Sequence, residues 1–257
     1  MTVHYETEGP VATVTIDRPE VANAVDGATA LRLVEIFEAF DADPALSVAV
    51  LTGAGGKFSA GGDLKAIFRG EGSIAVSPEG PGPLGPTRMM LSKPVIAAVE
   101  GHAVAGGLEL ALWCDLRVAA RNATFGVYCR RWGVPLCDGG TVRLPRLIGQ
   151  SHALDMILTG RGVGGEEAFR MGLVNRLCEP GGALAVAANL ADALARLPQT
   201  CLRSDRRSAH EQWTLPLAAA LRNETDRGLE VIRSPEMIQG ISRWSSGAWS
   251  RSEFTDA

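Results

Sequence analysis

Hydrophobic and polar positions in the first half of the chain follow two different periods. Residues 11–16 alternate between apolar residues and threonine or alanine, which is typical of a half-buried strand. Short continuous apolar runs such as Val48–Thr52 have the length of buried strands, whereas Leu31, Val34, Phe37 and Phe40 recur at helical spacing. The pattern predicts strands at 11–16, 48–52, 94–99 and 116–120, the last continued by 124–126, and helices at 26–40 and 108–113.

The second half of the chain has a largely helical pattern. Helices are predicted at 144–149, 152–158, 165–171 and 183–197, with glycine or proline between them, and residues 218–245 are predicted to be largely helical. Residues 69–88 are rich in glycine and proline and are predicted to be a loop. Strand-and-helix units followed by helices indicate an α/β fold with a helical tail.

Composition and charge exclude several classes of protein. The chain has 257 residues, 46% of them hydrophobic, so it can form a sizeable core and is not a disordered chain. The net charge is −4 and no basic block stands out, so no nucleic-acid partner is expected. No apolar run approaches the roughly 20 residues of a membrane span, and the first residues lack the features of a signal peptide. We therefore expect no membrane partner and a cytoplasmic location.

Cysteine and histidine usage argues against structural cross-links. Five cysteines without a Cys-x-x-Cys pair do not make a disulfide framework. The four histidines lie far apart, and none has zinc-like spacing to a cysteine, so no metal site is predicted.

Glycine is in excess, at 30 residues or about 12% against a usual share of roughly 7%. Two clusters follow predicted strands: Ala60-Gly61-Gly62-Asp63 and Ala105-Gly106-Gly107. Neither fits a phosphate-binding P-loop or a dinucleotide fingerprint. Glycine allows backbone N–H groups to approach a ligand oxygen, so two converging clusters would make an oxyanion hole; the alternative is a pair of tight turns.

Several ordered segments are similar to the enoyl-CoA hydratase/isomerase (crotonase) family. The matching segments run from about residue 11 to residue 178. They are Phe58–Leu64, Lys93–Val99, Gly106–Leu110, Cys114-Asp115, Phe125-Gly126, Gly139–Thr141, Leu158–Gly160 and Gly172–Val174.

The resemblance implies a spiral of ββα units with a C-terminal helical trimerisation region. On this basis residues 1–195 are expected to form the core with the acyl-CoA site and residues 196–257 the helical region, assembled as a homotrimer or a dimer of trimers. The implied substrate is an acyl-CoA thioester. No separate cofactor is expected, because coenzyme A is part of the substrate.

The family's oxyanion hole carries over onto the backbone N–H groups of Gly62 and Gly106. Two such donors stabilise the negative charge on the oxygen of a thioester enolate. Further substrate contacts implied by the resemblance are Ala22, Ala24, Ala60, Gly61, Asp63 and Leu64. Gly107, Tyr128, Trp132 and Gly133 are additional candidate substrate-binding residues. Tyr128 and Trp132 are interpreted either as walls of an acyl pocket or as core and rim residues.

The family's hydratases use two glutamates as acid/base groups. The first lies three residues after the oxyanion glycine, which is Glu109 here. Burial would raise the pKa of this carboxyl and a helix N-terminus would lower it. The alternative is a glutamate that only interacts favourably with the helix dipole.

The place of the second glutamate is taken by Cys129, four residues after Phe125. This departure puts ordinary hydratase and isomerase activity in doubt. Cys129 is interpreted as a packed small residue, as a nucleophile activated by Arg130 or Arg131, or as a weak proton-transfer group.

Asp138 is the candidate replacement carboxylate, although an aspartate beside two glycines is also typical of a turn. The hypotheses are therefore an enzyme resembling enoyl-CoA hydratase that uses Glu109, an isomerase or other enolate enzyme that uses Asp138, and a catalytically weak acyl-CoA binder.

Overall fold

A six-stranded sheet forms the centre of the molecule. The computed structural model describes residues 2–70, 74 and 76–247. The strands lie in the order β1-β2-β3-β4-β6-β9. The first two form an antiparallel hairpin and the others pair in parallel. Their bounds are β1 (Val3–Glu8), β2 (Val11–Ile16), β3 (Val48–Gly53), β4 (Val95–Val99), β6 (Leu116–Ala120) and β9 (Arg176–Cys178).

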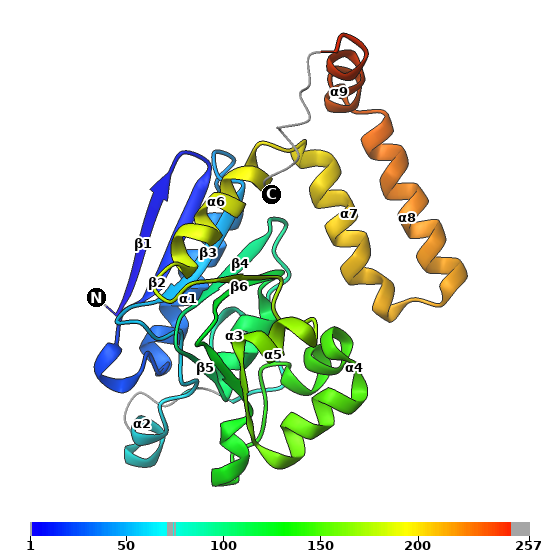
Figure 1. Ribbon diagram of the computed structural model, residues 1–257. Coiled ribbons are helices and arrows are strands. Elements are labelled where there is room, and N and C mark those ends of the chain that lie inside the picture. The colour runs from blue at the N-terminus through cyan, green and yellow to red at the C-terminus, as the bar shows by residue number, and fades with distance from the viewer. Residues whose placement is uncertain (1, 71–73, 75, 248–257) are drawn as a thin grey trace.

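Both faces of this sheet are covered, which explains the continuous apolar runs of its central strands. In β3, Val48 and Val50 pack with α6 (Ala183–Ala195), whereas Ala49 and Leu51 point into the larger core on the other face. Figure 1 shows α6 lying along one side of the sheet. The predicted strand 48–52 is thus confirmed.

Helix α1 (Gly27–Ala42) closes the other face of the sheet. Asp26 caps its N-terminus by accepting the Thr29 N–H, and its buried stripe includes Phe37. The Phe37 ring meets Trp113 edge-on at 4.8 Å, at the end of α3 (Gly106–Trp113). The sequence therefore predicted both helices correctly, to within two residues at each end.

A second sheet has three strands: β5 (His102–Val104), β7 (Thr124–Gly126) and β8 (Gly162–Gly164). The prediction that 124–126 continues strand 116–120 is wrong. A turn in which the Ala123 N–H donates to Ala120 O redirects the chain between β6 and β7, so the two strands lie in different sheets.

Helix α4 (Gly140–Thr159) contains both helices predicted at 144–149 and 152–158 as two helical segments that meet at a kink at Gly149. Gly149, with φ 78° and ψ 158°, interrupts the helical backbone without ending the element. The helix begins at Gly140, so the Gly139-Gly140 cluster forms its N-terminus. It is followed by α5 (Gly165–Arg170).

Three helices project from the sheet layers at the C-terminal side (Figure 1): α7 (Gln199–Glu211), α8 (Leu217–Ile232) and α9 (Pro235–Ser245). Helix α7 was not predicted. The stretch 218–245, predicted to be largely helical, contains two helices, because Ser234 and Pro235 start a new one. Within the expected helical region 196–257, residues 248–257 lie outside the described part, and its boundary with 1–195 stays a prediction.

The remaining elements are short. Helix α2 (Leu64–Arg69) precedes the predicted loop 69–88, of which 71–73 and 75 lie outside the described residues. Single 3-10 turns are η1 (Pro19–Val21), η2 (Pro86–Arg88), η3 (Tyr128–Trp132) and η4 (Gln212–Thr214). None of the described helices is both long and apolar enough to cross a membrane.

Candidate active site

The two glycine clusters are brought together by a short parallel pairing. Ser59 pairs with Ala103 of β5, and the Val104 N–H donates to Ser59 O over 3.1 Å. Gly62 and Gly106 each lie three residues beyond this pair. The two chains therefore leave the pairing together and place the glycines side by side.

The approach of the two clusters requires glycine. A methyl group on Gly61, whose φ is +87°, would lie 2.4 Å from Gly106 N, and one on Gly106 would lie 3.5 Å from Gly62 N. Within the described residues, neither the Gly62 N–H nor the Gly106 N–H donates to a protein acceptor. Gly106 is also the first residue of α3, where N–H groups point out of the helix. The geometry is that of a pair of free donors.

The residue before Gly106 is strained. Ala105 has φ 52° and ψ −126°, and its N–H donates to Gly126 O over 2.8 Å. A non-glycine residue in this region costs on the order of 1–3 kcal/mol. The strained residue, Ala105, directly precedes Gly106, so its backbone conformation sets the direction of the Gly106 N–H.

The carboxyl group of Glu109 lies one helical turn along α3 from Gly106. Glu109 is 2% exposed, and its Oε1 accepts the N–H groups of Asp138 and Gly140, each over 2.8 Å. Burial raises the pKa of Glu109 to about 7, although these N–H groups oppose the shift. A carboxyl group with this pKa both accepts and donates a proton near neutral pH.

Asp138, the predicted replacement carboxylate, holds a neighbouring segment in place. Its Oδ1 accepts the Leu84 N–H over 2.9 Å and the Thr87 hydroxyl. Arg143 completes a clamp by donating to Asp138 O at 2.9 Å and to Thr87 O at 2.6 Å. Burial raises the pKa of Asp138, and the Thr87 hydroxyl opposes that shift.

The clamped segment places Leu84 against the glycine pair. A methyl group on Gly106 would lie 2.4 Å from Leu84 Cδ1, and one on Gly62 would lie 4.0 Å from Leu84 Cδ2. Leu84 is 2% exposed. Leu84 is therefore an apolar side chain packed beside both glycines.

Cys129 is buried in η3 and has the features of a packed residue. Burial raises the pKa of its thiol, and the charge of Glu109 adds to the shift. The charge of Arg130 lowers the pKa of the Cys129 thiol but does not offset the effect of burial, and the Arg130 guanidinium donates to Ile157 O. Arg131 lies over the Tyr128 ring at 3.9 Å. These contacts favour the interpretation of Cys129 as a small packed residue over that of a nucleophile.

The residues expected to contact coenzyme A, in segments 22–24 and 60–64, lie side by side and are hydrogen-bonded to each other. The Ala60 N–H donates to Ala22 O over 3.0 Å, and the Arg18 guanidinium pairs with the Asp63 carboxylate at 3.1 Å and donates to Ala24 O. Asp63 caps α2, which begins at the exposed Leu64. Arg18 thus ties residues 22–24 to residues 60–63.

The aromatic residues predicted for the acyl pocket lie in η3. Tyr128 packs on the small sheet, since a methyl group on Gly126 would lie 2.6 Å from its Cε1. Trp132 is 74% exposed, and Gly133 ends η3 with a φ of 70°. Gly107 is instead packed against Ser59, whose carbonyl oxygen would lie 2.0 Å from an added methyl group.

Sequence reasoning missed the residues that organise the site: Leu84, Thr87, Gly140 and Arg143. Leu84 and Thr87 lay in the predicted loop 69–88. Gly140 and Arg143 lie just before the predicted helix 144–149, and no side-chain cap marks the true start of that helix at Gly140.

Comparison with known proteins identifies the family. Residues 6–245 match the family model described as enoyl-CoA hydratase/isomerase. The carnitinyl-CoA dehydratase of Escherichia coli (strain K12) is 39% identical over 245 residues, which are 93% of this chain and 93% of that protein. The chain belongs to the enoyl-CoA hydratase/isomerase family.

Solved structures of the enoyl-CoA hydratase/isomerase family agree in fold. An enoyl-CoA hydratase from Mycobacterium marinum has a TM-score of 0.90 and 37% identity, with 96% of each chain covered. One from Mycobacterium tuberculosis H37Rv has a TM-score of 0.90 and 38% identity, covering 95% of this chain and 96% of that one. The predicted crotonase-like fold is confirmed, and the chain is a hydratase/isomerase-type enzyme.

Proposed function

We propose that this enzyme adds water to, or removes it from, the acyl group of a coenzyme A thioester, with Glu109 as the acid/base group. The observation that carries the proposal is the buried Glu109 carboxyl, with a pKa of about 7, one helical turn from the free Gly106 N–H. The carnitinyl-CoA dehydratase relatives and the enoyl-CoA hydratase structures support this reaction class.

The N–H groups of Gly62 and Gly106 bind the thioester carbonyl oxygen. As the enolate forms, negative charge collects on this oxygen, and each fixed donor contributes about 3 kcal/mol to its stabilisation. The apolar Leu84 side chain packed beside both glycines lowers the local polarity, which strengthens both hydrogen bonds. The reaction changes no oxidation state overall, so proton transfer and charge stabilisation are sufficient without a redox or metal cofactor.

Glu109 performs the proton transfer in both directions. In hydration the carboxylate accepts a proton from the water that attacks C3, and a proton is delivered to C2 as the enolate collapses. One carboxyl with a pKa near 7 serves both steps, because its two protonation states are similarly populated at neutral pH. Asp138 keeps Leu84 and Thr87 in place and acts as a positioning residue.

The test is the conversion of crotonyl-CoA, followed by mass detection of the product. Hydration adds one water to the mass. Glu109→Gln is expected to lower kcat by about 10²–10⁴-fold, the usual range for losing a general acid/base. An unchanged rate for Glu109→Gln would refute the assignment of Glu109.

Cys129→Glu supplies the second test of the hydratase proposal. The new carboxylate restores the glutamate pair of the family's hydratases and lies within electrostatic range of Glu109. We expect crotonyl-CoA hydration to rise in this variant, with the pKa of Glu109 raised further by the added charge. A fall in rate with an intact fold would show that the site is adapted to a single carboxyl.

Double-bond isomerisation is the second candidate, because the site holds one buried carboxyl, Glu109, with a pKa raised to about 7 and this reaction needs a single base. A single base can remove a proton from C4 of the acyl chain and return it to C2 without water. The product then has the mass of the substrate and exchanges C2 and C4 hydrogens with deuterated solvent. Product mass therefore distinguishes the two reactions in one incubation. The homotrimer or dimer of trimers and the cytoplasmic location stay predictions.

A further inference from the structure

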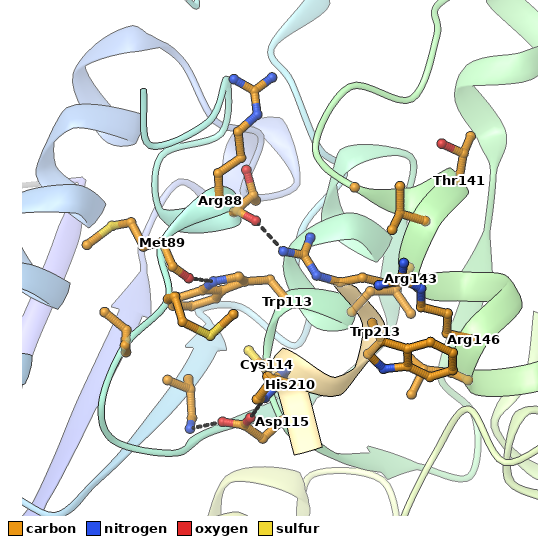
Figure 2. Close-up of a pocket in the computed structure, with 18 of the residues that line it drawn as sticks. Arg88, Met89, Trp113, Cys114, Asp115, Thr141, Arg143, Arg146, His210 and Trp213 are labelled. Carbon is orange, nitrogen blue, oxygen red and sulfur yellow. Dashed lines mark hydrogen bonds and ion pairs between the residues drawn. The ribbon is translucent and has the colours of Figure 1, made fainter. Parts of the chain in front are cut away.

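A cavity of about 600 Å³ lies between α4, the 87–91 segment and the C-terminal helix α7 (Figure 2). This volume is typical of small-molecule sites. The cavity is separate from the glycine pair but adjoins the Glu109 site. Cys137 and Gly139 line it, and the Asp138 N–H between them donates to Glu109.

The charges around this cavity are unbalanced. Five arginines line it, and Asp115 is the one carboxylate among its lining residues. Asp115 is already engaged, since it accepts from Arg206 Nε over 2.8 Å and lies 2.9 Å from His210 Nε2. Arg117 is buried and donates to backbone carbonyls, including Cys114 O at 2.7 Å. The protein as a whole has a net charge of −4, so the lining of this cavity is opposite in sign to the chain as a whole.

Two of the arginines are available for an anion. Arg146 lies over the Trp213 ring at 4.7 Å, and Arg143 donates only to the carbonyl oxygens of Asp138 and Thr87. Within the described residues neither forms an ion pair. In Figure 2 both come from the α4 side of the cavity. The Arg88 guanidinium instead bonds to the carbonyl oxygens of Ser77 and Cys137.

Part of the wall is apolar. Met89, Leu112, Trp113 and Trp213 line the cavity and carry no charge, and Figure 2 shows Met89 and Trp113 across from Trp213. A guanidinium pair beside such walls suits a carboxylate carried on a short carbon chain, because the carboxylate pairs with arginine and the chain is removed from water. The same walls give a fully hydrated inorganic anion little contact.

We propose that this cavity binds the carboxylate of a small organic acid, with Arg146 as the principal partner and Arg143 as the second. The carboxylate has two possible sources. One is the far end of the acyl chain of a dicarboxylic thioester processed at Glu109, and this source rests on the proposed function. The other is a free carboxylic acid that binds beside the site.

Binding of free acid is tested first, with glutarate as the probe and its neutral diamide as the control. Fluorescence reports the binding, because an anion on Arg146 changes the surroundings of Trp213; Trp213→Phe assigns the signal, and calorimetry measures the affinity independently. We expect saturable glutarate binding that weakens about tenfold in Arg146→Gln. Arg207→Gln is the matched control, since Arg207 pairs with Glu211 on α7 and does not line the cavity.

The source of the carboxylate is tested with two enoyl thioesters, crotonyl-CoA and glutaconyl-CoA, which carries a terminal carboxylate. If the acyl chain is the source, wild type prefers glutaconyl-CoA in kcat/KM, and Arg146→Gln lowers this preference about tenfold. If Arg146-dependent glutarate binding occurs without this preference, the site takes a free acid. If Arg146-dependent glutarate binding occurs while neither thioester reacts, the proposed function fails and the cavity assignment stands. Equal glutarate affinity in wild type and Arg146→Gln, or no binding, overturns the cavity assignment.

Discussion

Glu109 Oε1 accepts the backbone N–H of Gly140 over 2.8 Å, so a side chain of α3 is held by the first residue of α4. The sequence suggested that the dipole acting on Glu109 would be that of its own helix. The structure instead directs a second helix N-terminus at the carboxyl group. Burial still dominates, and the pKa of Glu109 is raised to about 7.

Because the pKa of Glu109 is raised in the folded protein, ionisation of this carboxyl lowers the stability of the fold near neutral pH. The carboxyl titrates near 4.5 when unfolded and near 7 when folded, so its contribution to stability is present below pH 4.5 and is lost as the pH rises to about 7. The loss is about 3 kcal/mol at one pKa unit per 1.36 kcal/mol. A glutamine side chain at this position would keep the acceptor oxygen for both N–H groups without the charge.

We therefore expect Glu109→Gln to unfold at a higher denaturant concentration than wild type at pH 8, with a smaller difference at pH 5. Urea unfolding at the two pH values measures this. A variant less stable than wild type at pH 8 would show that the buried charge is compensated by groups other than the two N–H donors.

Gly61→Ala tests the contact between the two glycine clusters. The added methyl group would lie 2.4 Å from Gly106 N and displace the donor pair, so kcat/KM is expected to fall by about 10²–10³-fold. Gly56→Ala is the matched control, because Gly56 also has a positive φ, of +71°, but has nothing within 4 Å of an added methyl group. It should lose only about 1–2 kcal/mol of stability. Equal activity losses in both would mean that backbone strain alone is responsible.

Asp138 is tested by two substitutions that separate positioning from proton transfer. Asparagine at this position keeps an oxygen acceptor for the Leu84 N–H and the Thr87 hydroxyl, whereas alanine removes it and leaves a buried donor unpaired, at a cost of about 1–3 kcal/mol. We expect Asp138→Asn to retain kcat within about tenfold and Asp138→Ala to lose more. Equal and large losses in both would instead assign Asp138 to proton transfer.

The exposed apolar side chains of the C-terminal helices make the predicted oligomeric state testable. Ile232 on α8 and Ile238 and Ile241 on α9 are exposed, which is costly for a free monomer. Light scattering is expected to give three or six times the 27.1 kDa chain mass, and Ile238→Glu to lower it. Glu224→Ala on α8 is the control. A wild-type mass of one chain would contradict the trimer prediction.

The sequence was informative where structure is local. The period of apolar positions located the buried strands and α1, and the spacing from Ser59 to Gly62 and from Ala103 to Gly106 is a property of two short segments. Strand β1 was not predicted because it is an edge strand whose side chains are mostly exposed. Helix α7 was not predicted because its sequence is mainly polar.

The position of Leu84 beside the glycine pair could not be predicted either, because it depends on a contact between residues far apart in the sequence. Leu84 lies beside the glycine pair, and its N–H donates to Asp138, which is 54 residues away in the sequence. Such a contact depends on how α4 packs against the core, and no local pattern encodes it. The pKa of Glu109 likewise depends on burial that is complete only in the assembled fold.

The pH dependence of kcat/KM for crotonyl-CoA hydration tests the central claim most directly. The free enzyme's base must be ionised to accept a proton from water, so kcat/KM should rise with pH through an apparent pKa of about 7. The residual activity of Glu109→Gln should lack this step, with thioester binding retained. A wild-type profile that is flat between about pH 5.5 and 8.5, or a step near pH 7 that persists in Glu109→Gln, would contradict the assignment of Glu109 as the catalytic acid/base group.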